Sequence, residues 1–82
     1  MTIDEFVQLI DRSGDIMLTC GKYKLTIITW ADEGIGIGFQ NKNPALNKIQ
    51  YFSSSTELVN KFLLDGIPLA KLSDKIIIDQ CT

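Results

Sequence analysis

The sequence of 82 residues contains no histidine, two cysteines, two prolines and one tryptophan. Without histidine, it lacks the side chain that most often serves as general base, proton shuttle and metal ligand near neutral pH. The hydrolases and zinc sites that depend on imidazole are therefore excluded. We expect no catalytic residue, no metal site and no cofactor, and we predict that the protein is not an enzyme.

Clusters of basic residues and long apolar runs are missing as well. Eight Lys and Arg against ten Asp and Glu give a formal net charge of -2, and the basic residues are scattered. Such a chain lacks the basic patch of a nucleic-acid binder, and it is too weakly acidic to mimic a nucleic acid.

No window approaches the roughly 18 consecutive apolar residues of a membrane span, and the N-terminal residues are acidic where a signal peptide is basic. We expect a cytoplasmic protein that binds neither nucleic acids nor membranes.

The two cysteines, Cys20 and Cys81, are interpreted as reduced thiols. Small secreted domains that are held together by disulfides usually carry more cysteines than two. Cys20 shares its strand parity with Ile16 and Leu18, which predicts a buried and unreactive thiol. The catalytic pairing of cysteine with histidine is not possible in this sequence.

Two segments have the pattern of amphipathic helices. Residues 2–13 place apolar side chains at helical spacing, begin with a Thr2–Glu5 capping box and end at Gly14. Residues 54–65 begin with a capping box at Ser54, carry an apolar stripe and end at Asp65-Gly66. The apolar stripes comprise Ile3, Phe6, Val7 and Ile10 in the first helix and Leu58, Val59, Phe62 and Leu63 in the second.

Between the helices the apolar residues alternate with a period of two, which is typical of strands. We predict strands over residues 16–20, 23–30, 35–40 and 48–52, and a last one over 75–79. Turn residues separate them at Gly21-Lys22, at residues 31–34 and at residues 41–44, where Asn-Lys-Asn-Pro breaks the pattern. Pro68 is expected to begin a short helical turn that runs through Leu72.

The predicted fold is a small α+β domain that spans residues 1–82, in the order α-β-β-β-β-α-β. It consists of an antiparallel meander of four to five strands with both amphipathic helices packed on one face. The parity of the more apolar side chains identifies the face that is turned toward the helices. This set comprises Ile16, Leu18, Cys20, Tyr23, Leu25, Ile27, Ile35, Ile37 and Phe39.

Glycine occupies every second position of the third strand, at Gly34, Gly36 and Gly38. The spacing matches neither a dinucleotide-binding loop nor a Walker loop. Glycine weakens a strand unless another group approaches the backbone closely. A three-residue loop over residues 32–34 would place Trp30 opposite Gly36 and Ile28 opposite Gly38. The glycine strip is then either covered by the Trp30 indole or open as a groove.

Two polar clusters receive structural interpretations. Asp32 and Glu33 lie at a hairpin tip, where nothing nearby supplies the further oxygen ligands of a cation, so we expect an exposed turn. The serine run at residues 53–55 is explained by the requirement for a polar residue at a helix start.

The candidate functional surface is the face of the sheet turned away from the helices. Its members are Met17, Thr26, Ile28, Trp30, Gly36 and Gly38. We expect a protein-interaction or regulatory module of the inhibitor, immunity or antitoxin kind, whose partner is another protein or a second copy of the chain. Stoichiometric binding needs only about 800 Å² of surface on each side. The alternative is a small-molecule-binding or minor enzymatic domain that functions as an oligomer, because a domain of this size rarely encloses a ligand pocket on its own.

Overall fold

The computed structural model describes residues 1–40 and 49–82, with the backbone alone at Trp30 and Ala31. It confirms the α+β fold, while the predicted turn at residues 41–44 lies outside the described residues. The fourth strand is shorter than predicted, and Lys48 is not among the described residues. The elements are α1 (Ile3–Arg12), β1 (Asp15–Cys20), β2 (Tyr23–Ala31), β3 (Gly34–Phe39), β4 (Gln50–Phe52), α2 (Ser55–Lys61), β5 (Leu63–Leu64), β6 (Ile67–Pro68), the 3₁₀ helix η2 (Leu69–Lys75) and β7 (Ile76–Cys81).

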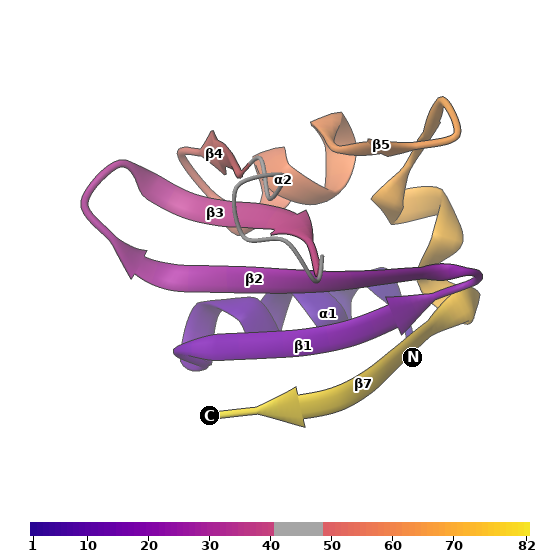
Figure 1. Ribbon diagram of the computed structural model, residues 1–82, viewed down its shortest axis with the longest axis horizontal. Helices are drawn as coiled ribbons and strands as arrows, with labels where there is room; N and C mark the ends of the chain where they lie inside the picture. Colours follow the sequence, from indigo (N-terminus) through magenta and orange to yellow (C-terminus); the bar gives the residue numbers. More distant parts are fainter. Residues whose placement is uncertain (41–48) are drawn as a thin grey trace.

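The main sheet is antiparallel and has the strand order β4-β3-β2-β1-β7 (Figure 1). Strands β1 to β4 follow one another as a meander, and β7 returns to pair with the free side of β1. The β1–β7 pairing contains a bulge, because Leu18 pairs with Ile78 whereas Met17 pairs with Gln80. The intervening Asp79 accepts a hydrogen bond of 2.6 Å from the Thr19 hydroxyl.

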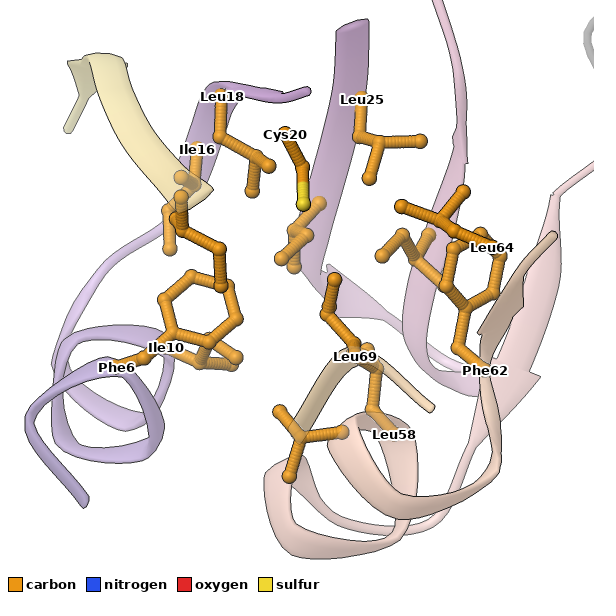
Figure 2. Close-up of a cluster of buried hydrophobic side chains, with 14 residues drawn as sticks. Phe6, Ile10, Ile16, Leu18, Cys20, Leu25, Leu58, Phe62, Leu64 and Leu69 are labelled. Carbon is orange, nitrogen blue, oxygen red and sulfur yellow. The ribbon is translucent and has the colours of Figure 1, made fainter. Parts of the chain in front are cut away.

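The helices α1, α2 and η2 pack on one face of this sheet, as predicted. Figure 1 shows α1 behind β1 and β2, and Figure 2 shows side chains from helices and strands meeting in one core, with the Cys20 side chain pointing into it. The side chains expected to face the helices are buried or partly buried, except for Phe39. Phe39 is 40% exposed and lies at the margin of the core. It packs there against Tyr23 and Phe62, at centroid distances of 5.6 and 6.1 Å. The buried apolar residues are Phe6, Ile10, Ile16, Leu18, Cys20, Leu25, Ile27, Ile37, Leu58, Val59, Phe62, Leu64, Leu69 and Ile76.

Both helices begin at the predicted capping residues. Thr2 accepts a hydrogen bond from the Glu5 amide, and the Glu5 carboxylate accepts one from the Thr2 amide. Ser54 accepts from the Glu57 amide in the same way. The Glu57 carboxylate, however, accepts from the hydroxyl and amide of Ser53 rather than from Ser54. The serine run therefore has the structural role that the sequence predicts.

The second helix is shorter than predicted, because α2 ends at Lys61 and Phe62 is its C-cap. The Asp65-Gly66 pair does not end this helix but forms the turn of the β5–β6 hairpin. Both residues have positive φ, 55° and 80°, which is the conformation of a type I′ turn and explains the Asp-Gly sequence. Leu63, expected on the apolar stripe of the helix, is consequently 51% exposed.

The β2–β3 hairpin has a two-residue loop, not the predicted three-residue loop. Ala31 pairs with Gly34 across the turn, and the ladder is irregular between Ile28 and Ala31. Gly36 therefore pairs with Ile28, so the prediction that it faces Trp30 is wrong. Gly34 has a φ of 122°, and a Cβ atom there would overlap the Phe52 carbonyl oxygen. Only glycine fits this position without strain.

Candidate functional site: the outer face of the sheet

The outer face of the sheet, opposite α1, α2 and η2, is not covered by any helix in the described part of the chain. Met17 on β1 and Ile77 on β7 are 41% and 62% exposed on this face. Ile49 and Tyr51, in and beside β4, are also exposed. Large apolar side chains thus remain accessible on strands at both sides of the sheet.

The strand pairings bring the predicted site residues together. Met17 pairs with Thr26, which in turn pairs with Gly38. In the neighbouring row, Ile28 pairs with Gly36. These five residues are therefore contiguous across β1, β2 and β3. The sixth predicted residue, Trp30, lies in β2, and its side chain is outside the described part of the structure.

At Gly36 the glycine strip is covered by side chains from the neighbourhood of β4. Gly36 pairs with Tyr51. A Cβ atom built on Gly36 would lie 2.8 Å from Ile49 Cγ2 and 3.0 Å from Tyr51 Cε1. The absent side chain thus admits the tyrosine ring and the isoleucine, which is the usual reason for glycine inside a strand. Sequence reasoning did not identify Ile49 and Tyr51 as part of this surface, although an aromatic residue in the fourth predicted strand was a signal for it.

Beside Gly38 the strip is hollow. A shallow cavity of about 170 Å³ is lined there by Thr26, Ile28, Gly38, Phe39 and Ile49. The strip is therefore covered at Gly36, and Gly38, which is buried as well, lines this cavity. The cavity is close in size to one that holds benzene, at about 150 Å³.

Among the described residues around the outer face, carboxylates are the more numerous charged groups. Asp15 lies at the end of β1, and Asp79 lies at the bulge of β7. Asp32 and Glu33 are exposed at the tip of the β2–β3 hairpin, as predicted. Lys24 on β2 supplies a positive charge near the opposite end, where it pairs with Thr19. As far as the structure describes the chain, the apolar centre of the face thus has a mainly acidic border.

Within residues 1–40 and 49–82, no group of three or more His, Cys, Asp and Glu side chains is arranged to hold a metal ion. Cys20 is buried and Cys81 exposed, and both are free thiols, as predicted. Burial raises the pKa of the Cys20 thiol above its ordinary value, which keeps the sulfur protonated and unreactive. None of the helices in the described ranges combines the length and apolarity that crossing a bilayer requires.

Comparisons with known proteins give no relative for this chain. No protein family matches it, and neither a curated protein nor a solved structure is significantly similar to it.

Proposed function

We propose that this protein is an interaction module that binds one protein partner stoichiometrically through the outer face, in the manner of an inhibitor, immunity protein or antitoxin. The observation that carries the proposal is the exposure of Met17 and Ile77 on a sheet face that no described helix covers. Exposed apolar side chains that gather on one face of a protein often mark partner sites.

The dimensions of the face support this proposal. The molecule measures 32 by 28 Å across its two longer axes, and the view down the shortest axis shows the strands of the sheet side by side (Figure 1). A typical stable complex buries about 800 Å² on each partner. The two longer dimensions of the molecule are thus compatible with one interface of this size.

The charges around the face indicate the chemistry of the partner. Asp15, Asp79 and the carboxylates of the hairpin tip border the apolar centre, and Lys24 is the basic residue at an outward strand position within the described residues. A complementary partner has an apolar patch bordered by Lys and Arg. A second copy of the chain would bring the same acidic border, so the charges favour a different, basic protein over self-association.

The sheet edges are less suited to binding than the face. β7 forms one edge, and its bulge at Asp79 interrupts the regular ladder that an added strand needs. β4, at the other edge, is only three residues long. Bulges, charges and short strands are devices that protect sheet edges from pairing with other chains.

The test compares two double variants that carry the same added charge. Met17→Lys/Ile77→Lys places two lysines on the outer face, whereas Gln8→Lys/Thr56→Lys places them at exposed positions on the helices. Proteins captured from a native lysate are purified, and their affinity is measured against both variants and the wild type. We expect one 1:1 partner, whose affinity falls about tenfold or more with the outer-face variant, falls with added salt, and is kept by the helix variant.

Two outcomes would contradict the proposal. The first is a folded outer-face variant that retains every partner with wild-type affinity. The second is a wild-type chain that is dimeric by light scattering and becomes monomeric in the outer-face variant, which would identify a second copy as the occupant. Circular dichroism verifies that both variants are folded.

A further inference from the structure

A second cavity lies at the end of the sheet where β1 turns into β2, away from the hollow at Gly38. It has a volume of about 270 Å³. The β1–β2 turn, the β5–β6 hairpin and η2 enclose it, so three segments that are distant in sequence form its walls. Its size approaches the lower end of small-molecule sites, about 300 Å³.

The wall of this cavity is mainly apolar. Leu64 from β5, Ile67 from β6 and Leu72 from η2 line it. Leu64 is almost fully buried, whereas Ile67 is 42% exposed. A cavity of about 150 Å³ already accommodates benzene, so this one has room for an apolar body of that size and for a polar group attached to it.

The polar groups of the cavity differ in the interactions that they form within the protein. The Asp65 carboxylate accepts a hydrogen bond from the Tyr23 hydroxyl. The Lys22 ammonium lies 5.3 Å from the centroid of the Tyr23 ring, in a cation–π contact. Lys75 also lines the cavity, and it forms no ion pair with any residue in the described ranges. The ammonium groups of Lys22 and Lys75 and the Asp65 carboxylate together give the cavity one net positive charge, which matches a monoanion rather than a phosphate dianion.

We propose that this cavity binds a small monocarboxylate with a compact apolar body. The body lies against Leu64, Ile67 and Leu72, and the carboxylate pairs with the Lys75 ammonium. Apolar walls with a few placed polar groups are the general design of small-molecule sites. The site is independent of the outer face, so either proposal stands if the other fails.

The test is a titration of the ¹⁵N-labelled protein followed by NMR, with benzoate as the probe and its neutral analogue benzamide as the comparison. We expect saturable shifts of the amide signals of Gly21, Asp65 and Ile67 with benzoate. Affinity for benzamide is expected to be lower by about threefold to fivefold, the scale of one partly exposed ion pair.

Lysine variants locate the charge that binds the probe. Lys75→Met is expected to weaken benzoate binding to the level of benzamide, whereas Lys75→Arg, which keeps the charge, retains it. Lys71→Met is the matched control, because Lys71 is an exposed lysine of the same 3₁₀ helix that does not line the cavity. Equal affinity for benzoate and benzamide, unchanged binding by Lys75→Met, or non-saturating shifts spread over the surface would each overturn the proposal.

Discussion

The hydroxyl of Tyr23 donates a hydrogen bond of 2.5 Å to Oδ1 of Asp65. It joins the first residue of β2 to the turn of the β5–β6 hairpin, across 42 residues of sequence. Each strand of this hairpin has only two residues, and a hairpin so short is not stable by itself. Burial of Leu64 and the bond from Tyr23 therefore hold it against the rest of the protein.

Tyr23→Phe, which removes this bond but keeps the ring, is expected to loosen the hairpin and to lower the melting temperature slightly. The measurement is amide hydrogen exchange at Leu64 and Ile67, which should become faster relative to the amides of β1 and β2. Tyr51→Phe is the matched control, because the Tyr51 hydroxyl has no hydrogen-bond partner among the described residues. Equal exchange in the wild type and Tyr23→Phe would show that the bond does not hold the hairpin.

The same bond predicts a dependence on alkaline pH. Donation to the Asp65 carboxylate raises the pKa of Tyr23 above its ordinary value, since it stabilises the protonated hydroxyl. A group whose pKa is raised by folding contributes stability that is fully present below the pKa of the unfolded chain, about 10 for tyrosine. The difference in melting temperature between the wild type and Tyr23→Phe should therefore be constant near neutral pH and should shrink above about pH 10. A difference that grows with alkaline pH would contradict this sign.

The loss of unfolding free energy on substituting alanine for each of three glycines should follow how closely the new Cβ atom approaches its neighbours. Gly34→Ala should cost about 3 kcal/mol or more, because it combines a positive φ with overlap against the backbone of Phe52. Gly36→Ala meets the side chains of Ile49 and Tyr51, which are exposed and can shift, so we expect about 1 kcal/mol. Gly14→Ala is the control, since its nearest neighbour is at an ordinary 3.5 Å, and its effect should stay within about 0.5 kcal/mol. Urea denaturation measures all three, and a Gly36→Ala cost equal to that of Gly34→Ala would contradict the ranking.

The helices α1 and α2 are joined by a hydrogen bond of 2.6 Å from the Ser55 hydroxyl to Asp11 Oδ1. Ser55 is the buried polar residue of the described chain, with 3% of its surface exposed. Ser55→Ala should lower the free energy of unfolding by about 1 kcal/mol. A double-mutant cycle with Asp11→Ala should give a coupling energy of similar size, about 1 kcal/mol, whereas a cycle of Asp11→Ala with the exposed Thr56→Ala should give none. Additive effects in the first cycle would show that the bond contributes no stability.

The start of α2 predicts a loss of stability in acid. Hydrogen bonds from the hydroxyl and the amide of Ser53 lower the pKa of Glu57. A carboxylate whose pKa is lowered by folding contributes stability that is present above its unfolded pKa, about 4.3, and is lost as the pH falls through the folded value. Glu57→Gln should therefore flatten the fall in melting temperature below about pH 5. Glu33→Gln, at the exposed hairpin tip, should leave that profile unchanged, and identical profiles for the two variants would contradict the assignment.

Periodicity and capping residues were sufficient to predict most of the fold. Alternation identifies the inward side chains because one face of the sheet is buried, so a one-residue slip would bring polar groups into the core. Side-chain caps such as Thr2 and Ser54 fix helix starts because the required residue types are few. The Asp65-Gly66 pair is ambiguous by comparison, since the same two residues stop a helix or form a type I′ turn. Contacts from Tyr23 and the core settle that choice, and neither is visible in the local sequence.

The sequence predicted only part of the candidate surface, since it missed Ile49, Tyr51 and Ile77, and it did not predict the register. Strand parity places Met17, Thr26 and Ile28 on the outer face without knowledge of how the strands pair. The register of β2 against β3 depends on one residue of loop length, and Gly34 permits either length. The side chains that cover Gly36 depend further on how β4 pairs with β3. The two strands are separated by a long connection, so the local sequence does not determine this pairing. The cavity at Lys75 was not predictable, because three separate segments must meet to form it.

The pairing of β7 with β1 has a consequence for how the chain folds. The two strands are joined by contacts about 60 residues apart, such as that between Thr19 and Asp79, whereas the meander needs only neighbouring segments. Closing the longer loop has the larger entropic cost, and contacts of long sequence separation slow folding. Until β7 pairs, β1 is an open edge of the sheet, and its free backbone groups can associate with other chains. The strand that completes the sheet thus also ends the interval in which the folding chain is open to aggregation.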